Sequence, residues 1–179
     1  MATSRFETQM YTSENYVESA GTVLFHLSTR KLCVLHLLET DEYVLPKGRR
    51  KVGEAANAAA IRETVEETGI PCRLLPINLA SRVCPVIEGE NVPDEARFYE
   101  AVCEPVAVQL RRLGEGNMKL TWWYVAAVNE DEPTGRHEAH TFGVELLDFE
   151  DAVQKLTFRD NRELVRKAIE LVNSTLASD

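Results

Sequence analysis

The sequence lacks the features of exported, membrane-spanning and disulfide-stabilised proteins. It contains only 4 cysteines in 179 residues, and no two have the Cys-x-x-Cys spacing of zinc or redox sites. Free thiols in a reducing compartment are therefore expected. No apolar run reaches the ~18 residues of a membrane helix, and the first residues contain no apolar core of a secretion signal. We expect a cytoplasmic protein, with the nucleus as the alternative, and no membrane partner.

Positive charge is also scarce. The chain has 20 Lys and Arg against 29 Asp and Glu, so its net charge is −9. An acidic chain argues against general nucleic-acid binding, because the phosphate backbone attracts basic surfaces. With 44% hydrophobic and 27% charged residues, the composition is that of a globular protein. We expect a single domain over residues 1–179, and nothing in the pattern indicates an oligomeric state.

The order of apolar and polar residues predicts strands before and after a central helix. Strands are expected at 16–27, 31–38, 43–45, 72–75, 79–86, 106–110, 119–128 and 141–147, and helices at 54–67, 149–156 and 160–176. Mixed strands with helices predict an α/β (α+β) fold in which a mixed β-sheet is sandwiched between α-helices. The long stretch 87–117 is expected to form a specificity lid or an interaction surface.

The helix expected at 54–67 combines an apolar stripe with crowded acidic residues. The residues of the stripe are Ala58, Ile61, Val65 and Thr68, which recur at helical spacing. Glu63, Glu66 and Glu67 lie off the stripe. Like charges three or four residues apart each destabilise a helix by about 0.2–0.5 kcal/mol. Carboxylates in the last turn oppose the helix dipole, at a cost of roughly 0.3–1 kcal/mol each. A solvated acidic face and a cation site are the two interpretations.

A divalent cation would remove this repulsion. Hard carboxylate oxygens without a Cys/His cluster suit Mg²⁺, or alternatively Mn²⁺, rather than zinc. Magnesium held by few carboxylates takes phosphate oxygens as further ligands, which is the arrangement for attack of water on a phosphoanhydride. The preceding loop carries the basic residues Lys47, Arg49, Arg50 and Lys51. We therefore expect an anionic polyphosphate small molecule as the partner.

Residues 48–70 resemble the Nudix box, G-x5-E-x7-R-E-U-x-E-E-x-G-U, where U is apolar. The matching residues are Gly48, Glu54, Arg62, Glu63, Glu66, Glu67, Gly69 and Ile70. Thr64 stands where an aliphatic residue is usual, and its methyl group can still pack. The resemblance implies the Nudix fold and a hydrolase that cleaves a diphosphate linked to a further moiety.

The resemblance also implies roles for these residues. It implies that Glu63, Glu66 and Glu67 are metal ligands and that Glu54 is a further ligand or an acid behind them. Arg62 would orient the glutamates, and Gly48 would permit a sharp turn in the loop. The base that activates water would be a box glutamate, Glu66 or Glu67, or a carboxylate from a later loop, for which Glu138 is the candidate. His137 and His140 beside it are expected to be solvated.

The segments 20–23, 45–48 and 158–162 resemble those of the diadenosine and diphosphoinositol polyphosphate phosphohydrolases. Adenine would need an aromatic platform, for which the candidates are Phe98, Tyr99, Trp122, Trp123 and Tyr124. An inositol ring bearing phosphates would need cations, and those outside the loop are Arg30, Arg82, Arg97 and Lys119. The cations favour a diphosphoinositol polyphosphate as substrate. A diadenosine polyphosphate or another nucleoside-diphosphate compound is the alternative.

A protein of a different class remains as a second hypothesis. A Nudix-fold module that binds phosphorylated ligands without hydrolysing them would be expected to have lost box glutamates. All of them are present here, so the enzyme is favoured.

Overall fold

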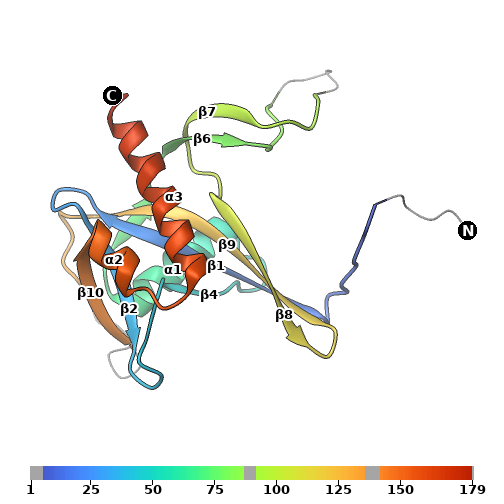
Figure 1. Ribbon diagram of the computed structural model, residues 1–179, viewed down its shortest axis with the longest axis horizontal. Coiled ribbons are helices and arrows are strands. Elements are labelled where there is room, and N and C mark those ends of the chain that lie inside the picture. The colour runs from blue at the N-terminus through green and yellow to red at the C-terminus, as the bar shows by residue number, and fades with distance from the viewer. Residues whose placement is uncertain (1–5, 87–91, 136–141, 179) are drawn as a thin grey trace, which may run out of the picture.

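The computed structural model describes residues 6–86, 92–135 and 142–178 (Figure 1). The strands are β1 (Tyr16–His26), β2 (Lys31–Leu37), β3 (Glu42–Val44), β4 (Lys47–Arg49), β5 (Cys72–Leu74), β6 (Ile77–Ser81), β7 (Arg97–Val102), β8 (Ala107–Gly114), β9 (Asn117–Val128) and β10 (Phe142–Asp148). The helices are α1 (Ala56–Thr68), α2 (Phe149–Lys155) and α3 (Arg159–Leu176). None of the helices in these ranges is long and apolar enough to cross a membrane.

The main sheet is mixed. Its strand order is β10-β2-β1-β9-β5, with β3 added to β2, β4 to β1 and β8 to β9. The central strands β1 and β9 are parallel and pair from Tyr16 opposite Met118 to Phe25 opposite Ala127. The other pairs are antiparallel. Helices α2 and α3 cover one face and α1 the other (Figure 1), which confirms the predicted α/β sandwich.

Both faces of the central strands are buried, because side chains alternate along a strand. Val23 and Phe25 of β1 belong to the core that also contains Val165 of α3. Leu24, between them, belongs to the opposite core, against which Ile61 of α1 packs. This explains why Val23, Leu24 and Phe25 are consecutive apolar residues rather than part of an alternating pattern.

The predicted stripe of α1 is partly wrong. The helix begins at Ala56 rather than at residue 54, and Ala58 is exposed. The buried residues are Ala59, Ala60, Thr64 and Thr68. The buried face is therefore rotated from the predicted stripe, because small alanines let this side of the helix approach the sheet closely.

Thr64 is accommodated by a partner on β1. The two residues are buried, and the Thr64 hydroxyl donates to the carbonyl of Ala60 at 2.7 Å. Its oxygen lies 2.8 Å from the Thr22 hydroxyl, which therefore donates to it. The departure from the box motif thus leaves neither hydroxyl unpaired in the core.

The expected strand at 79–86 ends earlier, at Ser81, and strands β4 and β7 were not expected. Strands β6 and β7 form a separate two-stranded ribbon beside α3 rather than joining the main sheet (Figure 1). The stretch 87–117 therefore contains β7, β8 and the start of β9. On β7, the aromatic residue Phe98 is 65% exposed, so it is not part of the core.

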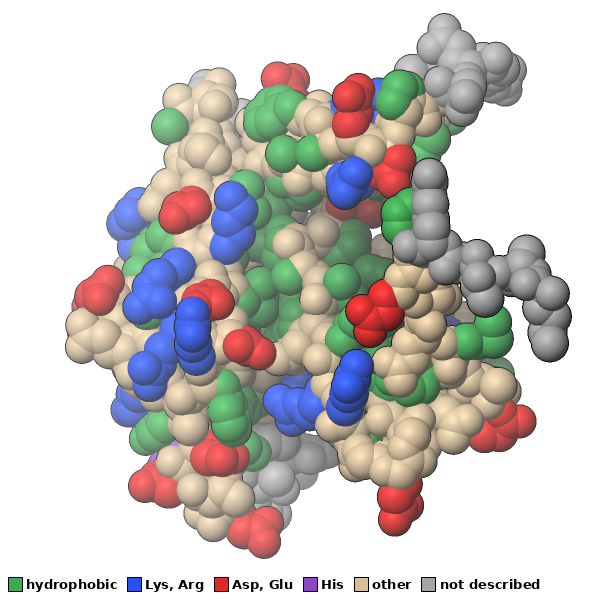
Figure 2. Space-filling model, turned by 45° about the vertical axis from the view of Figure 1, so that its right-hand side comes forward, with side chains coloured by type: hydrophobic (Ala, Val, Ile, Leu, Met, Phe, Trp, Pro, Cys, Tyr) green, Lys and Arg blue, Asp and Glu red, His purple; other side chains and the backbone are tan. Residues whose placement is uncertain are grey.

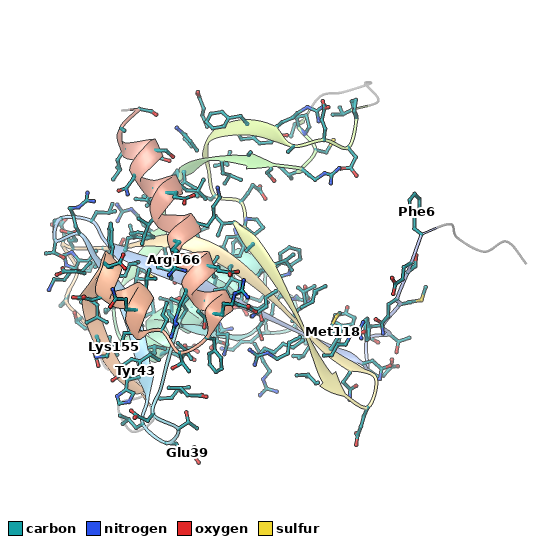
Figure 3. The ribbon with its side chains drawn as sticks, viewed as in Figure 1. Phe6, Glu39, Tyr43, Met118, Lys155 and Arg166 are labelled. Atoms are coloured by element: carbon teal, nitrogen blue, oxygen red, sulfur yellow. The ribbon has the colours of Figure 1, made fainter. Side chains whose placement is uncertain are left out.

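Side-chain contacts fasten α2 to the sheet edge. The Lys155 amine lies 4.5 Å from the centre of the Tyr43 ring and donates to Glu145 at 2.6 Å (Figure 3).

The four cysteines are free, as predicted. Burial raises the pKa of Cys33 and of Cys72 to about 12, so these two thiols are protonated at neutral pH.

Candidate active site

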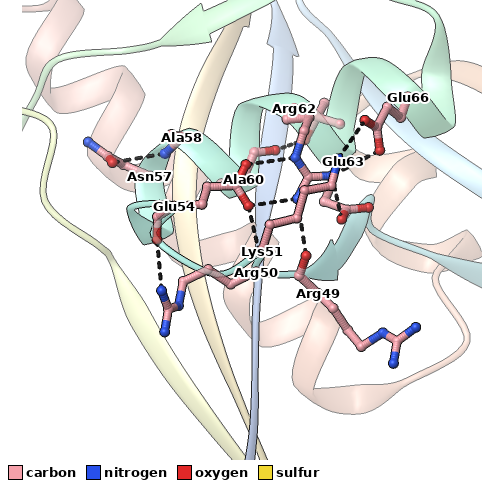
Figure 4. A network of polar contacts seen from close by, with 11 residues as sticks. Arg49, Arg50, Lys51, Glu54, Asn57, Ala58, Ala60, Arg62, Glu63 and Glu66 are labelled. Carbon is pink, nitrogen blue, oxygen red and sulfur yellow. Dashed lines mark hydrogen bonds and ion pairs between the residues drawn. The ribbon is translucent and has the colours of Figure 1, made fainter.

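Arg62 of α1 is the centre of a network of carboxylates (Figure 4). Its Nε and Nη2 donate to the two carboxylate oxygens of Glu54, at 2.7 and 2.8 Å. Its Nη1 donates to Glu63 Oε1 at 2.7 Å and to Glu66 Oε2 at 2.9 Å. One guanidinium therefore holds three of the box glutamates on one side of the helix.

The same network joins the helix to the loop before it. Arg62 Nη2 also donates to the carbonyl of Arg49 at 3.1 Å, and Glu54 accepts from the Lys51 amide at 2.8 Å. The side chains of Arg62 and Glu54 are only 21% and 15% exposed. The hydrogen bond from Arg62 lowers the pKa of Glu54 to about 2, and that from Glu54 raises the pKa of Arg62. Both groups are charged across the physiological range.

The low pKa of Glu54 makes folding stability sensitive to acid. A carboxyl whose pKa falls from 4.5 to about 2 on folding stabilises the folded state fully above its unfolded pKa. That contribution is lost as the pH falls from 4.5 toward about 2. We expect Glu54→Gln to be less stable than wild type at neutral pH, with the difference shrinking in acid. Urea midpoints near neutral pH and near the folded pKa test this; a difference independent of pH contradicts it.

Strand β4 places its backbone against the acidic face of α1. The Lys47 amide donates to Glu67 Oε2 at 2.8 Å. A Cβ added to Gly48 would overlap the carboxylate of Glu63. Gly48 therefore provides the space for this carboxylate, rather than the sharp turn that the resemblance implied, since its φ is not in the left-handed region.

We expect Gly48→Ala to impair activity far more than stability. The new methyl group would displace the carboxylate of Glu63, which lies at the end of a flexible side chain and can move. A loss of roughly 10–100-fold in kcat/KM is expected, as for residues that orient metal ligands. Gly135→Ala is the control, because its Cβ would meet only the Gly69 carbonyl at 3.6 Å. A melting temperature that falls as steeply as activity contradicts the prediction.

The donor set of α1 fits a divalent cation in its chemistry. Glu63, Glu66 and Glu67 present carboxylate oxygens from adjacent turns, the ligand type of Mg²⁺. In the described ranges, no three acidic, His or Cys side chains already lie close enough to hold a metal. The hydrogen bonds hold these carboxylates apart: Arg62 donates to Glu63 and Glu66, whereas the Lys47 amide of β4 donates to Glu67.

The basic loop is less available for substrate than its sequence suggested. Arg50 Nε and Nη2 both donate to Glu18 Oε2, at 2.8 and 2.7 Å, and Nη1 donates to the Glu54 carbonyl. Lys51 Nζ lies 3.7 Å from Glu66. The guanidinium of Arg49, in contrast, points away from the network (Figure 4).

Sequence reasoning did not select Glu18, which connects the network to the sheet. Its Oε1 accepts from the Trp122 indole at 3.2 Å, while its Oε2 holds Arg50. Glu18 precedes the 20–23 segment by two residues, but its partners lie far along the chain. It became recognisable only once β1, β4 and β9 were placed side by side.

We expect Glu18→Gln to lower kcat/KM by roughly 10-fold, the lower end for residues that position a site through others. The amide keeps the shape but loses the charge that holds Arg50, and therefore loosens the loop before α1. Glu145→Gln is the matched control, because Glu145 pairs with Lys155 at 2.6 Å outside the network. Steady-state kinetics measure the difference, and equal losses in both variants would refute the role.

The other aromatic and basic residues considered for substrate binding lie in different parts of the structure. Trp123 and Tyr124 are 2% and 6% exposed and belong to the core, and Trp122 contacts Glu18. Arg82 and Arg97 pair with Asp94 and Glu95 beside the β6–β7 ribbon, and Arg30 lies over Phe149. Glu138, with His137 and His140, lies outside the described residues.

A pocket of about 250 Å³ lies on the α3 side of the sheet, next to Glu67. One part of its lining is polar and carries both signs of charge, with Lys47, Arg111, Glu42, Glu67, Gln109 and Asn161. The other part is largely apolar and includes Leu35, Leu37, Val44, Leu45, Trp123 and Phe158. The pocket therefore combines cationic and acidic side chains with an apolar wall.

The comparisons agree with this geometry. A family model for the NUDIX domain matches residues 18–168. The chain belongs to the Nudix family. It is therefore a Nudix hydrolase, an enzyme that acts on pyrophosphate bonds. None of the curated proteins matches the sequence.

Solved structures share the Nudix fold at low sequence identity. The chain is 23% identical to the Ap4A hydrolase of C. elegans, with a TM-score of 0.56 over 87% of this chain and 97% of that one. It is 11% identical to a NUDIX hydrolase from Nitrosomonas europaea, with a TM-score of 0.59 over 86% and 88%. It is 12% identical to a UDP-X diphosphatase, with a TM-score of 0.55 over 90% and 66%.

Proposed function

We propose that this Nudix hydrolase uses Mg²⁺, or alternatively Mn²⁺, to cleave a phosphoanhydride bond in a multiply phosphorylated small molecule. The observation that carries the proposal is the Arg62 network, which holds Glu54, Glu63 and Glu66 on one side of α1. Like charges at this spacing destabilise a helix, and a bound cation would offset the repulsion that Arg62 does not neutralise.

Each box residue has a separate task in this proposal. Glu63, Glu66 and Glu67 would hold the cation, which when bound would polarise phosphoryl oxygens and lower the pKa of water. Arg62 orients Glu63 and Glu66, and Glu54 keeps Arg62 in place. Glu66 is the candidate to accept the proton of the attacking water, because its side chain is 48% exposed and solvent reaches it. Glu67 and Glu138 are the other candidates for this base.

We propose a diphosphoinositol polyphosphate as the first candidate substrate. Lys47 and Arg49 lie on β4 on either side of Gly48, which faces the carboxylate of Glu63, and the Arg49 guanidinium is directed outward (Figure 4). Such cations suit a substrate with many phosphates. A dinucleoside polyphosphate is the second candidate, favoured by the apolar part of the 250 Å³ pocket, where Phe158 is 39% exposed.

A substrate screen tests the proposal. Purified protein is incubated with diphosphoinositol, diadenosine, sugar-nucleotide and capped-RNA polyphosphates, with Mg²⁺ or with excess EDTA, and products are measured by mass spectrometry. We expect Mg²⁺-dependent cleavage of a phosphoanhydride bond and no cleavage in EDTA. Binding of these compounds without turnover would support the silent binding module instead. Undiminished turnover in EDTA would contradict the metal.

A further inference from the structure

The strand register gathers cationic side chains from three strands on one face of the sheet. On β4, Arg49 lies opposite Ser19 of β1, which in turn lies opposite Thr121 of β9. Paired residues direct their side chains to the same face. One row further, Lys119 of β9 lies directly opposite Arg111 of β8. We define the cationic face as Lys47 and Arg49 on β4, Arg111 on β8 and Lys119 on β9.

The cationic face is electrostatically unbalanced. Like charges directly opposite in an antiparallel pair destabilise it, and Arg111 and Lys119 are such a pair. Within the described ranges, none of the four side chains has an ion pair or a side-chain hydrogen bond. Burial lowers the pKa of Lys119, and so do the neighbouring charges of Lys47, Arg111 and Arg49, whereas the charge of Glu67 alone acts in the opposite direction. Unbalanced charge of this kind is expected where a ligand supplies the opposite sign.

A buried hydroxyl at the centre of this face provides an independent observation. Ser19 is 0% exposed, and its Oγ has no hydrogen-bond partner in the structure. It lies between Arg49 and Thr121 in the same row. A buried hydroxyl without a partner is destabilising, and a water, an ion or a ligand atom would satisfy it.

We infer that the cationic face and Ser19 form an anion subsite for phosphate groups remote from the scissile bond. The inference rests on the proposed function, selects Lys119 from the candidate cations, and adds Ser19 and Arg111 to the substrate-binding residues. Lys47 and Arg111 also line the pocket that Glu67 lines, so the subsite adjoins one of the proposed metal ligands. Figure 2 shows a hollow with hydrophobic walls and Lys and Arg side chains along its lower rim. The ligand class is a substrate with several phosphates beyond the cleaved anhydride.

A binding experiment tests the subsite without catalysis. Inorganic tripolyphosphate is titrated into the full chain in EDTA by calorimetry, for wild type and for Arg111→Gln/Lys119→Gln. We expect the double variant to bind at least 10-fold more weakly, with a smaller dependence on salt. Ser19→Ala should also weaken binding while leaving the salt dependence unchanged, since it removes a donor and no charge.

Arg112→Gln is the matched control, because Arg112 neighbours Arg111 on β8 but points to the opposite face and is exposed. Wild-type affinity in Arg111→Gln/Lys119→Gln, or an equal loss in Arg112→Gln, would overturn the inference.

A kinetic experiment separates this inference from the proposed function. The kcat/KM of Arg111→Gln/Lys119→Gln is measured on a multiply phosphorylated substrate and on a simple sugar-nucleotide diphosphate. We expect at least a 10-fold loss on the first and little change on the second. Equal losses on both would overturn the subsite while leaving hydrolysis intact. If wild type binds tripolyphosphate through these residues but hydrolyses nothing, the proposed function fails and the subsite stands.

Discussion

Glu67→Gln is expected to lower kcat by at least about 100-fold while leaving the fold intact, the scale on which removal of one preorganised polar group acts in other enzymes. The amide is close in shape to the carboxylate but carries no negative charge. The substitution therefore weakens the binding of a cation while it preserves the packing of the side chain. Its side-chain oxygen can still accept from the Lys47 amide, as Glu67 does at 2.8 Å. Glu66→Gln should have a similar effect, because Glu66 is both a candidate ligand and a candidate base.

Two comparisons make this prediction decisive. Circular dichroism and thermal melting should match wild type in each variant, because Glu66 is 48% exposed and an amide can replace it without disturbing the core. Glu170→Gln is the control, since Glu170 on α3 forms only a long pair with Lys167 at 3.8 Å. Wild-type turnover in Glu67→Gln would exclude it from the metal site.

Arg62→Lys is expected to lower kcat/KM by roughly 10–100-fold, as for other residues that orient metal ligands. A lysine amine cannot form the two parallel hydrogen bonds that Arg62 makes to Glu54 while also reaching Glu63. The pKa of Glu54 should rise from about 2 toward its ordinary value, because the hydrogen bond from Arg62 is the largest cause of its lowering. Activity and the acid dependence of unfolding should therefore change together.

Arg159→Lys is the matched control for this substitution. Arg159 also donates to a glutamate four residues later, Glu163, at 2.7 Å, but its side chain is 87% exposed. Exposed pairs of this kind contribute little to stability, so neither activity nor unfolding should change. If Arg62→Lys retains full kcat/KM, the guanidinium has no orienting role.

The residues of the candidate site could be selected from the sequence because most of them lie within a few turns of one helix. Glu63, Glu66 and Glu67 are close in sequence, and helical spacing places Glu66 one turn from Arg62 and Glu67 one turn from Glu63. The strands β1, β2 and β9 follow from apolar runs, and the sandwich follows from strands and helices that each need a second layer. The rotation of α1 could not be predicted in this way, because both Ala58 and Ala59 are compatible with a packed helix.

The tertiary structure decided what surrounds the box. Glu18 meets Trp122 across the parallel pairing of β1 and β9, and Thr22 meets Thr64 between sheet and helix. The outcome for the basic residues depended on the same pairings: Arg50 is held by Glu18, whereas Arg49 shares a face with Lys119. Such contacts depend on register, and a shift of one residue would turn each side chain to the other face of the sheet. Periodicity in the sequence indicates that side chains alternate between the two faces of a strand. Only the pairing of distant strands determines which side chains each one contacts.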